Sequence, residues 1–325
     1  MELKFNVLKI LYERQGYTSG IELASILGVS RTAIWKSVNS LRTMGYAIEA
    51  ASRRGYRLVK TPDLLLPYEI KRGLRARSFG GRIEYYQEVG STNDVARELA
   101  IQGTPEGTVV VAETQSMGRG RMGREWFSPK GGIWLSVVLR PRVSPDKVSK
   151  LALMFGVVAT KTLLLEGVEC GLKWPNDVLV DDKKVCGILT EIDAELDVVN
   201  YVIIGVGINV NNDPMEFPPE FRDAATTLKA ELGREVPRAP IVRRFLEELE
   251  RAYRLFSSGE SSTMLEEWRS LSGTLGRNVR IVTHSRTFEG TATNIDDDGA
   301  LLLRLKDEKL ERVLSGDCIH LEEKI

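Results

Sequence analysis

Glycines and arginines alternate in the middle of the chain, at residues 118–124 (GRGRMGR). Glycines let the backbone come close to a ligand and present its N–H groups, while guanidinium groups bind phosphates and carboxylates through paired hydrogen bonds. The same composition also fits an exposed basic loop whose arginines are only solvated. The density of both residue types favours the first interpretation, a loop that wraps an anionic ligand.

These glycines also match the literal pattern G-x-G-x-x-G of dinucleotide-binding proteins. That pattern requires a helix directly after the glycines, because the helix N-terminus binds the pyrophosphate. Here residues 126–132 (WFSPKGG) are typical of turns and lead into an apolar strand at 133–139. A dinucleotide site is therefore excluded. The sequence also lacks the G-x-x-x-x-G-K-[ST] pattern of P-loop nucleotide sites.

Two further segments place polar side chains beside predicted strands. Residues 91–93 (STN) follow a strand at 83–86 and precede a helix at 95–99, so they either cap that helix or bind a small polar ligand. Residues 173–177 (KWPND) precede another strand, and Lys184 begins the next one. That lysine is either exposed on a hairpin or directed inward.

A glycine-containing strand at 202–211 completes the set. Glycines inside a strand often mark the close approach of a ligand, and this strand ends in asparagines. Together with the arginines, Lys184 and the acidic Asp177 indicate a site for an anionic nucleotide and a metal ion. Mg²⁺ needs only one or two carboxylates beside phosphate oxygens.

The charges of the chain are unevenly distributed, although their sum is zero. The 325 residues include 45 lysines and arginines and 45 aspartates and glutamates. Residues 1–60 contain ten basic and four acidic residues, so this segment carries +6 and the remainder −6. Zero net charge therefore does not exclude a nucleic-acid partner, because a basic module precedes a mildly acidic body.

The basic module has the pattern of a helix-turn-helix followed by a hairpin. Ser19 and Glu22 predict the start of a helix at 21–27, and Gly28 suits its left-handed end. Ser30 can cap the next helix, and residues 45–59 read as a hairpin with a basic tip, or wing. A small protein-binding domain is the alternative; we favour DNA binding because helix order, turn glycine and hairpin agree. The residues predicted to contact DNA are Arg31, Thr32, Trp35, Lys36, Arg53 and Arg54.

Composition limits the remaining possibilities. Hydrophobic residues make up 42% and charged residues 28% of the chain, which excludes a wholly disordered protein. We expect no membrane span and no signal peptide, and the three cysteines fit a reduced, cytoplasmic compartment. Amphipathic helices are predicted at 240–256 and 264–271, and short strands from about residue 276 predict a small barrel.

Taken in order, these motifs resemble those of bifunctional biotin protein ligases that also repress the biotin operon. The resemblance rests on residues 118–126, 173–177 and 205–211, on Lys184 with the glycine three positions later, and on the basic module in front. It implies an α+β protein: a winged helix-turn-helix at 1–62, a central mixed-sheet α/β ligase domain of the class II synthetase-like type at 63–273, and an SH3-like β-barrel at 274–325.

The activity that the resemblance implies has two steps. Biotin and MgATP form biotinyl-5′-AMP, and a lysine of the biotin carboxyl carrier protein of acetyl-CoA carboxylase then receives the biotin. It also implies a biotin-responsive repressor that binds the operator of biotin genes, and a homodimer when the adenylate is bound. A lipoate-type acyl ligase and a non-catalytic biotin-sensing DNA-binding protein are the alternatives.

The resemblance also implies residue roles. Lys184, Arg121 and Asp177 would be catalytic, and Asp177 would lie near Mg²⁺ or the acceptor lysine. The Pro-rich residues 212–219 match the family's adenylate-covering loop poorly, so no role is assigned there. Biotin would contact Ser91, Thr92, Asn93, Gln115, Arg119, Gly120, Arg121 and Lys184, and the adenylate would contact Arg119, Arg121, Trp126, Lys184 and Asn209.

Overall fold

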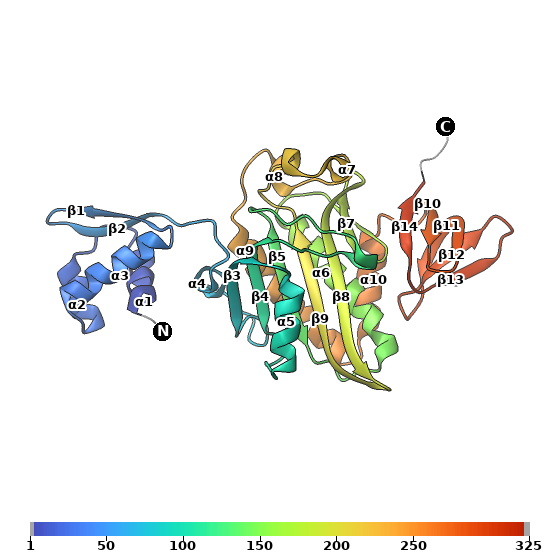
Figure 1. Ribbon diagram of the computed structural model, residues 1–325, viewed down its shortest axis with the longest axis horizontal. Coiled ribbons are helices and arrows are strands. Elements are labelled where there is room, and N and C mark those ends of the chain that lie inside the picture. Colours follow the sequence, from blue (N-terminus) through green and yellow to red (C-terminus); the bar gives the residue numbers. More distant parts are fainter. Residues whose placement is uncertain (1–2, 322–325) are drawn as a thin grey trace. The chain divides into compact units, whose positions relative to one another are not determined.

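The computed structural model describes residues 3–321, apart from the side chain of Ser261. The chain divides into two compact units, Met1–Leu64 and Leu65–Ile325 (Figure 1). The division lies two residues after the boundary expected between residues 62 and 63.

The N-terminal unit has three helices and a hairpin: α1 (Leu3–Arg14), α2 (Gly20–Leu27), α3 (Arg31–Thr43), β1 (Ala47–Ala51) and β2 (Gly55–Lys60). The caps are those predicted: the hydroxyl of Ser19 accepts a hydrogen bond from the Glu22 N–H at 3.1 Å, and that of Ser30 accepts one from the Ala33 N–H at 3.2 Å. Gly28 ends α2 with φ +64°. The predicted helix-turn-helix and its hairpin are confirmed.

A seven-stranded mixed sheet forms the centre of the second unit. Only the β3–β4 pair is parallel among its neighbouring strands in the described residues. The predicted mixed sheet is therefore confirmed. In spatial order its strands are β3 (Ile83–Val89), β4 (Val109–Gln115), β5 (Ile133–Leu139), β9 (Val198–Ile208), β8 (Lys183–Glu195), β7 (Asp177–Val180) and β6 (Gly171–Lys173).

Helices cover the two faces of this sheet (Figure 1). Helix α5 (Thr92–Ile101) packs on one face, over β4, β5 and β9. On the other face, α6 (Ser149–Leu164) packs against the sheet and is joined by α9 (Arg238–Ser257) and α10 (Ser261–Leu271). Helices α9 and α10 begin two and three residues before the predicted ones. Short helices α4 (Pro67–Lys71), α7 (Pro219–Arg222) and α8 (Leu228–Leu232) lie at the ends of loops.

Five short antiparallel strands follow the helices. They are β10 (Asn278–Val282), β11 (Thr287–Ile295), β12 (Leu301–Leu305), β13 (Leu310–Val313) and β14 (Asp317–His320). Their buried Val279, Ile281 and Leu303 belong to the same apolar core as the central sheet. The β-rich C-terminal segment is therefore packed against the central sheet and its helices. No helix within residues 3–321 has the length and apolarity needed to cross a membrane.

Candidate active site

A cavity of about 480 Å³ opens beside the central strands of the sheet, a size suited to a small-molecule ligand. The structure brings every ligand-contacting residue expected from the sequence to its wall. They come from the start of α5, the end of β4, the glycine–arginine loop, the β7–β8 hairpin and the segment after β9. These residues are Ser91, Thr92, Asn93, Gln115, Arg119, Gly120, Arg121, Trp126, Asp177, Lys184 and Asn209.

The first turn of α5 provides buried hydroxyl and amide groups at one end of the cavity. The carboxamide oxygen of Gln115 accepts hydrogen bonds from the backbone N–H and the hydroxyl of Thr92, at 2.8 and 3.0 Å. The side-chain N–H of Gln115 donates to Ser128 at 2.8 Å. These bonds fix which way the Gln115 amide points. Ser91 stands at the N-cap position but its side chain makes no capping hydrogen bond, so capping does not account for this hydroxyl.

Asn93 is held between the sheet and the cavity. Its amide oxygen lies 2.6 Å from the hydroxyl of Ser136, and its amide N–H donates to Glu191 at 3.0 Å. A Cβ at Gly205 would lie 2.4 Å from that amide oxygen. The glycine is therefore required for Asn93 to pack directly on β9, which explains one of the two glycines seen in this strand.

Trp126 lies against the same strands further along the cavity. A Cβ at Gly207 would lie 2.5 Å from its Nε1, and one at Gly187 would lie 2.8 Å from its Cζ3. The indole N–H is buried and has no hydrogen-bond partner within residues 3–321. A ligand with an acceptor atom at this wall would satisfy it.

The β7–β8 hairpin brings together the lysine and the carboxylate expected to take part in the chemistry. Lys184 Nζ lies 2.7 Å from Asp177 Oδ1 and 5.0 Å from the centroid of the Trp126 ring. The lysine is thus directed into the cavity, and the alternative of a solvated hairpin lysine is wrong. Its side chain is 32% exposed, so the ammonium group remains accessible to a ligand.

Arg121 and Arg124 connect the glycine–arginine loop to the C-terminal segment. Arg121 Nη1 donates to Asn176 Oδ1 and to the Gly316 carbonyl, both at 3.2 Å, and Arg124 forms an ion pair with Asp317. Burial lowers the pKa of the Arg121 guanidinium below its ordinary value. Asp317 was not predicted from the sequence, since nothing in the local pattern links it to a loop almost two hundred residues earlier.

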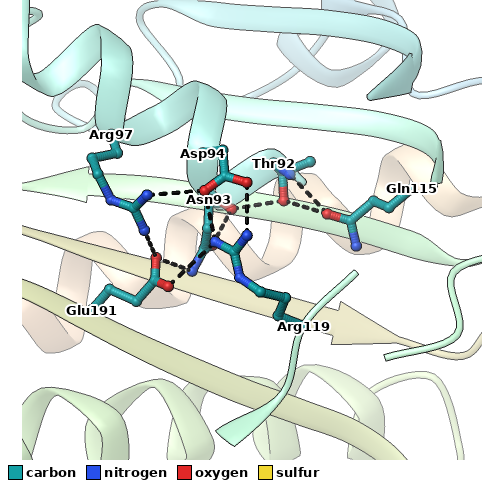
Figure 2. Close-up of polar contacts among 8 residues, drawn as sticks. Thr92, Asn93, Asp94, Arg97, Gln115, Arg119 and Glu191 are labelled. Atoms are coloured by element: carbon teal, nitrogen blue, oxygen red, sulfur yellow. Dashed lines mark hydrogen bonds and ion pairs between the residues drawn. The ribbon is translucent and has the colours of Figure 1, made fainter. Parts of the chain in front are cut away.

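Arg119 does not point a free cation at the cavity. Its guanidinium makes two hydrogen bonds to Asp94, at 2.7 and 2.6 Å, and lies 3.5 Å from Glu191 (Figure 2). Arg97 completes the cluster by pairing with both carboxylates. The hydrogen bond from Arg119 lowers the pKa of the Asp94 carboxyl. Neither Asp94 nor Glu191 was identified from the sequence.

Residues 217–224, which begin in the Pro-rich stretch, contribute to the cavity although the sequence assigned them no role. Phe217 and Phe221 line the wall, and Phe217 meets Phe127 edge to face with ring centroids 6.0 Å apart. The Lys184 backbone N–H donates to the Ala224 carbonyl at 2.8 Å. The segment therefore lies directly over the hairpin that carries Lys184.

In the N-terminal unit, the side chains expected to meet DNA are exposed. The exposed residues of α3 include Trp35, whose side chain is 55% exposed, and the wing carries two exposed arginines. The guanidinium of Arg54 lies 4.1 Å from the Tyr17 ring centroid, so the wing is held against the segment between α1 and α2. All six predicted DNA-contacting residues are exposed: Arg31, Thr32, Trp35, Lys36, Arg53 and Arg54.

Three family descriptions match consecutive parts of the chain. Residues 4–57 match an HTH domain, residues 85–209 the Biotin/lipoate A/B protein ligase family, and residues 274–321 the Biotin protein ligase C terminal domain. The matches follow the order of the helices, the mixed sheet and the short antiparallel strands.

Similar proteins of known name cover nearly the whole chain. The Bifunctional ligase/repressor BirA of Bacillus subtilis is 41% identical over 303 residues, 93% of each chain. The protein of that name from Escherichia coli is 32% identical over 289 residues, 88% of each chain. A solved biotin protein ligase from Aquifex aeolicus, in complex with biotin and ATP, is 28% identical with a TM-score of 0.64, covering 74% of this chain and 98% of that one.

Proposed function

The chain belongs to the family of biotin protein ligases with a helix-turn-helix repressor domain, and from this premise we propose how its residues carry out the reaction. The protein is a biotin–[biotin carboxyl carrier protein] ligase that uses biotin and ATP, and a DNA-binding repressor. The observation that carries the residue assignment is the convergence of Lys184, Asp177 and Arg121 on one cavity.

In the first step, a biotin carboxylate oxygen attacks the α-phosphorus of ATP. A C–O–P bond forms, the bond from the α-phosphorus to the bridging oxygen breaks, and pyrophosphate leaves. Two anions must approach each other, so cations are needed between them. Lys184 and Arg121 supply these charges, and both stabilise the charge that develops on the transferred group and the leaving group.

Biotin and the adenylate occupy different parts of the cavity in this proposal. The buried groups of Ser91, Thr92, Asn93 and Gln115 bind biotin, supported by hydrogen bonds that fix the Gln115 and Asn93 amides. Gly120, Trp126 and Asn209 surround the activated end of the molecule. The guanidinium of Arg119, in the same loop as Gly120, is already bound to Asp94.

In the second step, the amine of the carrier-protein lysine attacks the biotinyl carbonyl and AMP leaves with the bonding electrons. The nitrogen gives up a proton to the departing AMP phosphate as the amide forms. Asp177 stands at the cavity wall where it can orient the incoming amine. The glycine–arginine loop covers the intermediate and excludes water, which would otherwise hydrolyse the mixed anhydride.

Asp177 is also the candidate ligand for Mg²⁺. No cluster of three metal-ligating side chains occurs within residues 3–321, so an all-protein metal cage is not formed there. One carboxylate beside phosphate oxygens and water is the donor set that Mg²⁺ accepts, and Asp177 fits it. The ion would neutralise phosphate charge when bound, while Lys184, 2.7 Å from Asp177, keeps the carboxylate oriented toward the cavity.

For DNA binding, we propose that α3 enters the major groove and that the wing contacts phosphates. One helix-turn-helix reads only a half-site, so the operator-bound form is a homodimer, formed when the adenylate is bound. The three cysteines are free in the structure, which supports a cytoplasmic location.

A gel-shift titration tests the regulatory half of the proposal. The full chain is titrated against the upstream region of biotin genes, with and without biotin plus MgATP. We expect tighter binding with both substrates present. DNA binding that ignores biotin and ATP would overturn the assignment of the adenylate as corepressor.

A further inference from the structure

Four charged side chains form a compact cluster where the glycine–arginine loop meets α5 and β8 (Figure 2). Asp94 and Arg97 come from α5, Glu191 comes from β8, and Arg119 comes from the loop. Arg97 lies 2.9 Å from Asp94 and 2.7 Å from Glu191, and Arg119 reaches the same two carboxylates from the other side. Two cations and two anions therefore balance within the cluster.

The Arg119 side chain attaches the glycine–arginine loop to helix α5. Both of its terminal nitrogens bond the two oxygens of Asp94, a paired arrangement that is stronger and more directional than a single ion pair. Its side chain is 36% exposed, and the hydrogen bond to Asp94 raises its pKa further. A ligand phosphate would have to compete with a carboxylate that already occupies the guanidinium fork.

The cluster also touches the end of the cavity assigned to biotin. Glu191 Oε2 accepts hydrogen bonds from Arg97 and from the amide of Asn93, at 2.7 and 3.0 Å. Asn93 is the residue packed against Gly205 in the cavity wall. The carboxylate that orients this amide is thus part of the cluster that holds the loop.

Within residues 3–321, the loop is also attached to Asn176 and the C-terminal segment through Arg121 and Arg124, and its Gly118 carbonyl accepts a hydrogen bond from the Trp126 N–H. Within the loop, the Gly120 N–H donates to the Arg124 carbonyl at 2.8 Å, which closes residues 120–124 into a small turn. Arg119 holds the start of this turn to α5, while Arg121 and Arg124 hold the turn to the C-terminal segment. Release of Arg119 would therefore free the side of the turn that faces α5.

We propose that Asp94 and Glu191 are positioning residues that hold the glycine–arginine loop closed over the adenylate by binding Arg119. Arg119 is then the latch of the loop, and Arg121 is the loop arginine that faces the reacting groups. Arg97 neutralises the second carboxylate. This inference rests on the proposed function, and it gives the loop a defined point of attachment outside the ligand.

Asp94→Asn and Glu191→Gln test the latch, with Asp94→Glu as the charge-preserving variant and Glu289→Gln as a control. Glu289 forms an ion pair with Arg280 on the β10–β11 hairpin and does not line the cavity. Two quantities are measured in the full chain with biotin and MgATP. The first is biotin transferred to serum albumin, which reports escaped adenylate; the second is the rate of trypsin cleavage within residues 119–124.

Loss of a charge-assisted, paired hydrogen bond should increase adenylate escape and loop cleavage by about tenfold in Asp94→Asn. Glu191→Gln should also increase adenylate escape and loop cleavage. It should raise the biotin KM as well, because the Asn93 amide would no longer donate to a charged carboxylate. Asp94→Glu and Glu289→Gln should stay within about twofold of wild type, because one keeps the charge and the other lies outside the cavity. The rate of biotin-dependent pyrophosphate exchange at saturating substrate should change little, because Lys184 and Arg121 remain in place.

Wild-type escape and cleavage in Asp94→Asn, with pyrophosphate exchange intact, would overturn the latch. A second result would also overturn the latch. If Asp94→Asn and Glu191→Gln both lose adenylation and adenylate retention to the same extent and both have a lowered melting temperature, the two carboxylates have a purely structural role. Absence of biotin-dependent exchange in the wild-type protein would instead refute the proposed function, so the two failures are distinguishable.

Discussion

Gly207→Ala would place a methyl group where the Trp126 ring now lies. The new Cβ would be 2.5 Å from Nε1, 2.6 Å from Cε2 and 2.8 Å from Cζ2 of the indole, all well inside van der Waals contact. Strand β9 cannot give way easily, because Gly207 is paired with Trp134 of β5 on one side and Gly187 of β8 on the other. The indole must therefore move.

Overpacking of this kind costs about 1–3 kcal/mol. If Trp126 forms the wall that receives the adenylate, the cost falls on the ligand-binding conformation and corresponds to about a 5- to 150-fold loss of affinity. We expect the ATP KM in biotin-dependent pyrophosphate exchange to rise by this factor. The biotin KM should change less, because the buried amides near Gly205 are not displaced.

Two alanine variants serve as comparisons. Gly205→Ala would bring a methyl group to 2.4 Å from the Asn93 amide oxygen, so it should raise the biotin KM more than the ATP KM. Gly81→Ala has open space around the new Cβ and no left-handed φ, so it should behave as wild type. An unchanged ATP KM in Gly207→Ala would refute the assignment of Trp126 to the adenylate site.

Four further predictions concern charged residues. Lys184→Ala should abolish most adenylation while the melting temperature changes little; wild-type exchange kinetics would contradict its role. Arg121→Gly should slow biotin-dependent pyrophosphate exchange and let the adenylate that does form escape and label unrelated lysines; retention as tight as in wild type would be inconsistent with that. The buried Glu113 carboxylate lies 2.7 Å from Arg238 and would lose its cation in Arg238→Met. Urea denaturation should then show a loss of about 3–5 kcal/mol in unfolding free energy. An unchanged denaturation midpoint would show that the ion pair is dispensable. Arg119 lowers the pKa of the Asp94 carboxyl, so the two groups are fully paired above the ordinary aspartate pKa, and the pairing is lost only as pH falls through the lower pKa of the folded protein. Adenylate retention should therefore be constant between about pH 6 and 8. A decline across that range would indicate another titrating group.

The sequence predicted the parts of the site that are encoded locally. The glycine–arginine loop, the segment before Asp177 and the glycines of β9 are each recognisable as short motifs, and the structure brings them to one cavity. The caps at Ser19 and Ser30 were equally predictable, because a cap depends on neighbours three residues away.

Contacts set by strand register and tertiary packing were not predictable in this way. Glu191 meets Asn93 across 98 residues only because β8 and β9 pair in a particular register beneath α5. Asp317 reaches Arg124 only because the C-terminal strands pack against the sheet. Helix α6 was missed for a different reason: it is apolar around most of its circumference, so it lacks the periodic pattern that marks a surface helix.

The most direct test of the account is the exchange of labelled pyrophosphate into ATP by the full chain, with biotin or lipoate as the added acid. The account predicts exchange that requires biotin, is absent with lipoate and is lost in Lys184→Ala. Exchange supported equally by lipoate, or no exchange with biotin, would contradict the claim that this cavity makes biotinyl-AMP.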